Sequence, residues 1–324
     1  MLYAIIIFII VVFAYSHVMR EYKTSHDLEI YELDYTTPQE LQSVCNLKQP
    51  MIFDFSKTVP SFFSKINTAI TTTKCPTELN IYDCNDVPPQ AAAEPFAELS
   101  LSRFENLIIT DSKKHFITEN NADFIDDCGS MYETFENLDE YFKDYFVVKK
   151  AYDILMGSAG AATPLRFHKN SRQFYVVTEG KIRVKMTPHK NARHLHSFID
   201  YRAFVFGSPV NVWDTQAQYV DDIAKIDFLE FDVAAGSVFY LPPYWWCSIM
   251  FVDDKTVVAG ATYWTLQNVA ANAVDLFQHW RERGDGDTTA AGDASQQQND
   301  GDADVDADTD ISANNHETTV VTNE

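Results

Sequence analysis

The stretch Ala235-Gly-Ser-Val-Phe-Tyr-Leu-Pro-Pro-Tyr-Trp-Trp-Cys247 places a run of strand-forming residues between a glycine and a pair of prolines. Glycine and proline interrupt regular structure, so the run predicts a short strand from Ser237 to Leu241 with a sharp turn after it. Upstream, Glu179-Gly180 separates two more β-rich runs, Gln173 to Thr178 and Lys181 to Met186, and predicts a hairpin.

Other β-rich runs follow the same pattern at Phe204 to Phe206, Phe228 to Val233, Ile249 to Val252 and Val257 to Trp264. Many short strands with Gly and Pro between them predict a sandwich or barrel, because alternating strand and helix patterns would be needed for a parallel α/β sheet. The second half of the chain is therefore expected to be all β.

The first half adds helices to this predicted β core. Thr37-Pro38-Gln-Glu40 has the composition of a helix start, Met51 to Phe55 is strand-like, and Pro60 to Ile70 has apolar residues at helical spacing. An aromatic stripe over Tyr132 to Phe146 predicts a packed helix, and Val269 to Arg283 predicts a helix that closes the domain. The expected class is mainly β with an α elaboration.

Two segments, in this order along the chain, resemble the JmjC and cupin-like oxygenases, whose fold is a double-stranded β-helix or jelly roll. Gly157-Ser-Ala-Gly-Ala-Ala-Thr-Pro-Leu-Arg-Phe-His168 resembles the family's Gly-Ser-rich stretch that leads to Thr-Pro-Leu-His-x-Asp. The Ala235–Cys247 stretch resembles Pro-Gly-Asp, a hydrophobic strand and Pro-x-x-Trp-Trp-His. Lys48-Gln-Pro50 also resembles the strand that opens the small asparaginyl-hydroxylase-like members. The resemblance implies a domain over residues 28–283 with its β-helix core at about 150–268.

In that family two histidines and a carboxylate hold Fe(II), leaving the other face of the metal for 2-oxoglutarate and O₂. The resemblance maps these three positions onto Arg166, His168 and Cys247, none of which is the required residue. A second registration uses His168 as the first ligand and Asn170 as the carboxylate position, and still ends on Cys247. A fixed positive charge at Arg166 opposes metal binding. We therefore expect a degenerate triad with no metal and no cofactor.

The same resemblance suggests a possible cosubstrate pocket and a pocket rim. The pocket candidates are Thr163, Lys181, Ile182 and Thr262, and the rim candidates are Tyr244, Trp245 and Trp246. The expected function is a catalytically inactive binding or scaffolding module that engages a protein or peptide. The alternative is a 2-oxoglutarate-dependent protein hydroxylase with non-standard Fe(II) ligands. His168 and Cys247 could also be packed interior residues, or hold a soft metal such as zinc or copper.

The N-terminal residues 1–19 predict a transmembrane anchor, because Leu2 to Tyr15 is uncharged and rich in Ile, Val and Phe. A cleaved signal peptide is the rival, since Ala14 and Ser16 suit a cleavage site. Arg20 and Lys23 follow the apolar run and favour a cytosolic globular part. Residues 20–27 predict a polar stalk. The whole layout resembles cupin-like membrane proteins of large DNA viruses and protists.

The C-terminal residues 284–324 predict a disordered acidic tail. No Lys or Arg follows Arg283, and eleven acidic residues there supply half of the net charge of −22. The remaining charge is still negative and excludes nucleic acid as the expected partner, because phosphate recognition needs a basic surface. The five cysteines are odd in number and widely spaced, so they imply neither a disulfide framework nor a zinc module. A homodimer through Val269 to Arg283 is possible.

Overall fold

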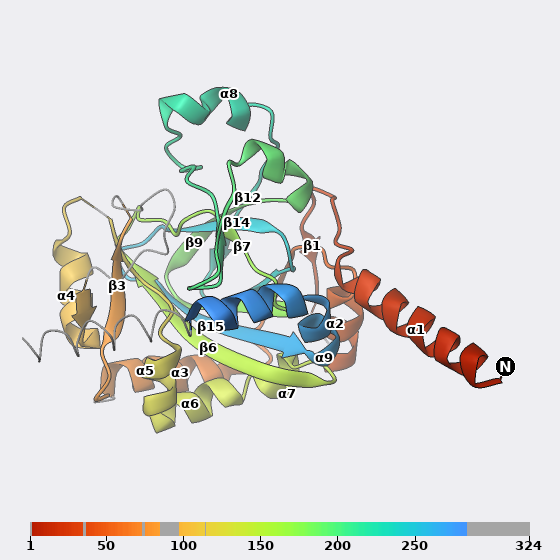
Figure 1. Ribbon diagram of the computed structural model, residues 1–324. Helices are drawn as coiled ribbons and strands as arrows, with labels where there is room; N and C mark the ends of the chain where they lie inside the picture. The colour runs from red at the N-terminus through yellow and green to blue at the C-terminus, as the bar shows by residue number, and fades with distance from the viewer. Residues whose placement is uncertain (1, 35–36, 73–74, 85–96, 114, 284–324) are drawn as a thin grey trace, which may run out of the picture.

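The computed structural model describes residues 2–34, 37–72, 75–84, 97–113 and 115–283. The described part is mainly β, with two large sheets and helices around them, as the sequence predicts (Figure 1). The predicted acidic tail, residues 284–324, lies outside the described residues.

The first sheet has nine strands in the order β1-β2-β13-β8-β15-β6-β5-β3-β4. Their bounds are β1 (Tyr31–Glu32), β2 (Met51–Asp54), β3 (Leu79–Asp83), β4 (Ala97–Leu99), β5 (Phe116–Thr118), β6 (Val147–Gly157), β8 (Arg172–Glu179), β13 (Ser237–Leu241) and β15 (Val257–Thr265). All of its pairs are antiparallel except that of β1 and β2. The strand predicted from the opening stretch is therefore β13, with the same bounds, between β2 and β8.

The second sheet has six strands in the order β10-β11-β7-β14-β9-β12. Their bounds are β7 (Arg166–Phe167), β9 (Lys181–Thr187), β10 (Phe198–Asp200), β11 (Val205–Gly207), β12 (Leu229–Ala234) and β14 (Trp246–Phe251). All of its pairs are antiparallel. Between β9 and β12 the chain makes an excursion that carries β10 and β11, which extend this sheet beyond β7, together with two 3-10 helices (His189–His194 and Ala217–Tyr219) and α8 (Val220–Ile223).

The hairpin predicted at Gly180 is wrong, because the strands on its two sides belong to different sheets. β8 pairs with β13 and β15, whereas β9 pairs with β12 and β14. Gly180 has φ +72°, and a Cβ there would lie 2.5 Å from the carbonyl oxygen of Lys255. Only glycine accepts both the positive φ and this close approach. The residue therefore forms a corner at which the chain crosses from one sheet to the other.

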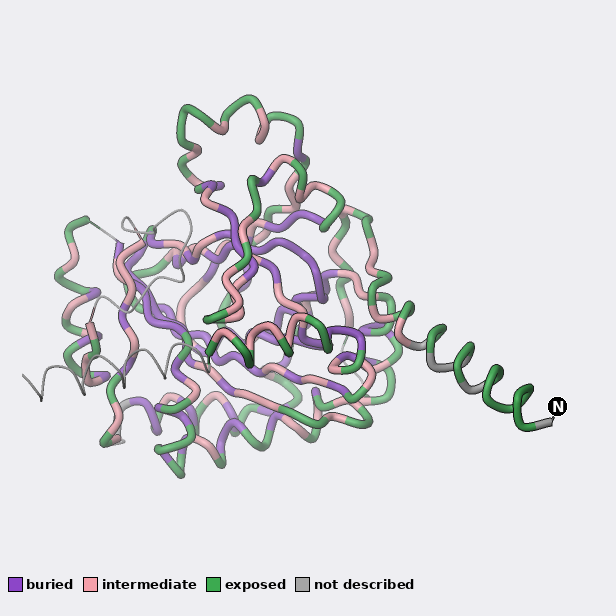
Figure 2. Tube along the Cα trace, viewed as in Figure 1, coloured by how far each residue is buried: buried purple, intermediate pink, exposed green. Residues whose placement is uncertain are grey.

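Helices cover the outer face of the first sheet, and the described core divides into three clusters. The covering helices are α2 (Pro38–Cys45), α3 (Pro60–Thr72), α5 (Ala122–Asp127), α6 (Gly129–Glu136) and α7 (Asp139–Phe142), while α4 (Leu101–Thr110) lies beside β3. A second cluster fills the space between the two sheets, and a third lies under the excursion that follows β9. Buried residues are concentrated along both sheets in Figure 2.

The helix starts follow ordinary capping chemistry. Thr37 is the N-cap of α2, its hydroxyl accepts the backbone N–H of Glu40, and Pro38 occupies the first turn, as predicted. The predicted closing helix begins earlier than expected, as α9 (Leu266–Ala271), because Thr265 caps it by accepting the N–H of Asn268. After a turn at residue 272, residues 273–283 are again helical.

This last helical segment places its polar side chains inward and an apolar stripe outward. The Asp275 carboxylate accepts from the Tyr201 hydroxyl at 3.0 Å and the Lys169 ammonium at 2.6 Å. Val274, Phe277 and Trp280, which share the opposite stripe, are 59–72% exposed. These three residues do not pack against the described body of the protein.

Helix α1 (Leu2–Glu21) projects away from the body (Figure 1), and nearly all of its described apolar side chains are exposed, as the green of Figure 2 shows. Across the ranges described, the structure contains no helix with both the length and the apolar character needed to cross a membrane. Residues of the predicted stalk bond to the body: the Tyr22 hydroxyl donates to the Ala271 carbonyl, and the Ser25 N–H donates to the Lys48 carbonyl at 3.2 Å.

A disulfide joins Cys75 to Cys128, although the sequence implied none. It ties the segment before β3 to the junction of α5 and α6, across 53 residues of chain. Cys45, Cys84 and Cys247 are free thiols. The pairing could not be read from sequence, because nothing in the spacing of five scattered cysteines selects these two.

Replacing both bonded cysteines, Cys75→Ser with Cys128→Ser, is expected to lower the free energy of unfolding by about 2–4 kcal/mol, since the unfolded chain regains the freedom of a long loop. Urea unfolding followed by circular dichroism measures this loss. Adding a reductant should lower the unfolding free energy of the unsubstituted protein to that of the double variant and should not change that of the variant. An unsubstituted protein that is insensitive to reductant would show that the bond is not formed.

Candidate functional site

The residue at the first triad position, Arg166, lies on β7 opposite Cys247 on β14. Its guanidinium makes a two-pronged ion pair with the Glu119 carboxylate: Nη1 donates to Oε1 at 2.8 Å and Nη2 donates to Oε2. The Arg166 and Glu119 side chains are only 16% and 4% exposed. Because Glu119 follows β5 of the first sheet and Arg166 belongs to the second, the pair bridges the two sheets.

The backbone around Glu119 is fixed by a second buried carboxylate. Asp153, on β6, accepts the N–H groups of Asn120 at 2.9 Å and Asn121 at 2.8 Å. Asn120 has φ +59°, the left-handed conformation that asparagine tolerates better than most residues. Burial raises the pKa of Asp153 to about 6 against the opposing effect of these hydrogen bonds. This turn holds Glu119 where its carboxylate meets Arg166.

The positive charge of Arg166 is permanent. Burial acts to lower the pKa of Arg166, but the Glu119 carboxylate outweighs it, so the pKa is raised above its ordinary value. The guanidinium therefore stays protonated at any physiological pH. Such a two-pronged pair satisfies both oxygens of the carboxylate and leaves it paired in a dry setting.

The other two triad positions are neutral near pH 7. Burial raises the pKa of the Cys247 thiol despite the nearby Arg166 charge, so the thiol keeps its proton. Burial, with Arg166 in addition, lowers the pKa of His168 to about 3. Cys247 packs in the cluster between the sheets, which agrees with the interior-residue alternative.

These residues do not fit the Fe(II) centre that the resemblance implies. At the first position the Arg166 guanidinium is already paired with the Glu119 carboxylate, and at the third position the Cys247 thiol is protonated. Within the described ranges, no three His, Cys, Asp or Glu side chains are grouped closely enough to hold a metal ion. The residues at these positions therefore supply no ligand set for iron.

The four cosubstrate candidates do not share one pocket. The Lys181 ammonium pairs with Asp232 at 2.7 Å on the outer side of the second sheet and is 37% exposed. Ile182 is fully buried between the sheets. The Thr163 hydroxyl accepts the N–H of Ile249, and Thr262 lies on β15 opposite Gln173. None of the four lines the pocket described below.

The three rim candidates belong to the core. Trp245 packs between the sheets and its indole N–H donates to the Thr24 hydroxyl at 3.1 Å. Trp246 and Tyr244 pack with Phe167 under the excursion that follows β9. At most 7% of any of the three is exposed, so they support the fold and do not surround an opening.

A pocket of about 350 Å³ lies against the ion pair, at the edge where the two sheets come together. One wall comes from β3 and β5 with the residues that follow them, including Tyr82, Cys84 and Glu119. The other wall comes from β7, β10 and β11 and the loops beside them, including Arg166, Phe198 and Ala203. Burial raises the pKa of the Cys84 thiol to about 12, so it is not a thiolate at neutral pH.

The arrangement suits binding more than proton transfer. Arg166 keeps its charge, His168 stays unprotonated, and Cys84 and Cys247 keep their protons across the physiological range. General acid–base catalysis works best with a group whose pKa lies near the operating pH. Asp153 has such a pKa, but its carboxylate is engaged by the N–H groups of Asn120 and Asn121 and does not line the pocket. What these groups provide is a mainly apolar cavity with a fixed polar wall, which is the usual composition of a ligand site.

Sequence reasoning missed Glu119, the residue on which the site depends. It lies 47 residues before Arg166 and belongs to no motif. The one signal was Arg166 itself, because a buried arginine needs an acidic partner.

Replacing Arg166 with a neutral side chain of similar length, Arg166→Met, is expected to cost about 3–5 kcal/mol of unfolding free energy, because Glu119 is left buried and unpaired. The double variant Arg166→Met with Glu119→Gln should recover most of that loss, since no uncompensated charge remains. Equilibrium unfolding of the four proteins in this cycle gives both quantities. Purely additive losses would contradict the pairing.

Acid should destabilise the protein in part through His168. Its pKa is near 6.5 in the unfolded chain and about 3 in the folded one. The unfolded state therefore binds more protons below pH 6.5, and stability falls as the pH drops toward 3. His168→Gln should remove this contribution, which is about 2 kcal/mol between pH 7 and pH 5. Parallel stability–pH curves for the two proteins would contradict it.

No family model matches the chain, and no curated protein is significantly similar to it.

Proposed function

We propose that this protein is a non-catalytic, membrane-attached binding module of the double-stranded β-helix type, which receives an apolar side chain of a partner protein in the pocket beside Arg166 and Glu119. The buried ion pair is the observation that carries the proposal. It fills the first triad position with a permanent cation and its own counter-ion.

The strand order supports the fold part of the proposal. Eight strands, β6 to β9 and β12 to β15, contribute four neighbours to each sheet, in the orders β13-β8-β15-β6 and β7-β14-β9-β12. The chain changes sheet at every step except from β9 to β12. A jelly roll is wound in this way, with successive strands placed alternately in two facing sheets.

The pocket supports the binding part of the proposal. Its volume of about 350 Å³ lies within the range of small-ligand sites and accommodates a large side chain. Tyr82 and Phe198 are rigid aromatic residues in its lining, of the kind that receive apolar anchors at protein interfaces. Arg166 and Glu119 already neutralise one another. An apolar side chain of a protein segment therefore suits this pocket, because it needs no charged partner there.

Membrane attachment rests on α1. Its exposed side chains include Ile7 at 61% and Phe8 at 67%, and single soluble domains seldom expose such a continuous apolar surface. Arg20 and Lys23 support the cytosolic placement of the globular part, whereas the Cys75–Cys128 disulfide is more typical of an oxidising compartment. The redox state of that bond in cells decides between the two sides.

A homodimer through residues 269–283 stays a prediction, which analytical ultracentrifugation can test. The exposed stripe of Val274, Phe277 and Trp280 favours it.

Filling the pocket tests the binding proposal. Peptides selected on the unsubstituted protein from a random display library should lose at least about tenfold in affinity for Ala203→Trp, because the indole would occupy the cavity. Ala217→Trp, also on the surface of the excursion after β9 but outside the pocket lining, is the matched control and should bind normally. Equal binding by both variants would place the partner elsewhere. Release of succinate from 2-oxoglutarate when Fe(II) and such a peptide are supplied would favour the hydroxylase alternative.

A further inference from the structure

The base of α1 forms a second hollow, separate from the pocket beside Arg166. This groove has a volume of about 420 Å³ and lies between the end of α1, the segment that follows it and the turn after α2. Arg20, Lys23 and Lys48 all contribute to its lining. The basic groove, as we name this hollow, is thus built from segments that are far apart in sequence.

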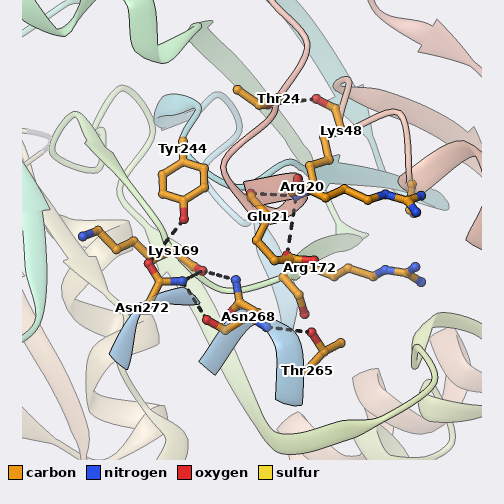
Figure 3. A network of polar contacts seen from close by, with 12 residues as sticks. Arg20, Glu21, Thr24, Lys48, Lys169, Arg172, Tyr244, Thr265, Asn268 and Asn272 are labelled. Carbon is orange, nitrogen blue, oxygen red and sulfur yellow. Dashed lines mark hydrogen bonds and ion pairs between the residues drawn. The ribbon is translucent and has the colours of Figure 1, made fainter. Parts of the chain in front are cut away.

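Lys48 joins the two sides of the basic groove (Figure 3). Its ammonium donates to the carbonyl oxygens of Glu21 at 2.7 Å and Arg20 at 3.2 Å, which are the last carbonyls of α1. A cation at this end of a helix satisfies free carbonyls and complements the helix dipole. Lys48 has φ +53°, so the turn after α2 accepts a strained backbone in order to place this ammonium.

The charge of the basic groove is opposite to that of the whole protein. It gathers three cations, Arg20, Lys23 and Lys48, in a chain whose net charge is −22. Two carboxylates are close by: Glu21 lies 3.5 Å from the Lys48 ammonium, and Asp27 accepts from the Ser25 hydroxyl at 3.3 Å. Arg20 and Lys23 are exposed. The groove therefore presents an excess of positive charge to solvent where α1 leaves the body.

We infer that the basic groove holds the phosphate-bearing headgroup of an anionic phospholipid. Arginine and lysine are the usual ligands of phosphate, and the exposed side-chain amide of Asn46, which also lines the groove, supplies an uncharged partner for the rest of a headgroup. Juxtamembrane cations gain about fivefold in affinity per residue from an anionic lipid surface. This inference rests on the proposed membrane attachment through α1.

The position of the basic groove selects a membrane lipid over a soluble phosphate. The exposed apolar side chains of α1 end at Met19, directly before Arg20. Leu47, which lines the same hollow, is 56% exposed. A headgroup bound at Arg20 and Lys23 would therefore have its acyl chains beside α1 and exposed apolar residues at the interface, an arrangement that an isolated phosphate ion does not use.

Native mass spectrometry of the full chain in nonionic detergent, with equal amounts of phosphatidylserine and phosphatidylcholine added, tests the inference. We expect the phosphatidylserine adduct to dominate by about five- to thirtyfold. Arg20→Gln with Lys23→Gln should bring the ratio near one, and both changes are on exposed side chains that leave the Lys48 contacts to α1 intact. The matched control is Lys57→Gln, an exposed lysine at the opposite end of β2, which should keep the preference.

The membrane attachment through α1 and the headgroup site in the basic groove are tested by different outcomes. If the full chain fails to float with phosphatidylcholine vesicles, the membrane attachment itself is wrong. If it floats but shows no preference for phosphatidylserine, or the Arg20/Lys23 variant keeps the preference, the headgroup site is wrong. Displacement of the lipid by inorganic phosphate at equal concentration would also overturn the assignment, since the groove would then bind free phosphate.

Discussion

The ion pair between Arg166 and Glu119 is the interaction on which the rest of the site depends. It joins a residue of β7 in one sheet to a residue that follows β5 in the other, at the edge where the sheets meet. Removing two charges from water costs several kcal/mol each, and a buried pair recovers this only with good geometry. Here both carboxylate oxygens are engaged, and the Asp153 carboxylate holds the backbone beside Glu119 in place.

This pair also determines the chemistry that the surrounding groups can support. The permanent Arg166 guanidinium lowers the pKa of His168 further than burial alone. It lies at the position that the sequence resemblance assigns to a metal ligand. The result is a site in which Arg166 stays charged while His168 and Cys247 stay neutral near pH 7. These constant charge states favour a binding role over catalysis, and the basic groove at the base of α1 is a second hollow whose charge is opposite to that of the whole chain.

Local patterns predicted most of the fold. The Gly and Pro boundaries of β13, the capping of α2 by Thr37 and the apolar spacing of α3 are decided by neighbouring residues, so the sequence contains them. The sequence identifies Gly180 as a turn residue, but a two-residue pattern does not tell whether the next strand joins the same sheet. That choice depends on Thr256 and Lys255, which crowd the glycine from a distant strand connection.

The site was harder to predict because its contacts are long-range. Arg166, His168 and Cys247 were found through motif positions, whereas Glu119 and the Cys75–Cys128 bond are products of the tertiary fold. The stripe of Val274, Phe277 and Trp280 showed the right helical spacing, but spacing does not reveal which face a helix buries. In this helix the inward face is decided by Asp275 and its bonds to Tyr201 and Lys169.

The most direct test of the central claim is the metal content of the protein. The full chain is equilibrated without oxygen in excess Fe(II) and 2-oxoglutarate, freed of unbound metal and analysed by inductively coupled plasma mass spectrometry. If Arg166 and Glu119 fill the metal position, iron should stay well below one equivalent, at about 0.1 or less per chain. About one equivalent of iron, retained only when 2-oxoglutarate is present, would contradict the account.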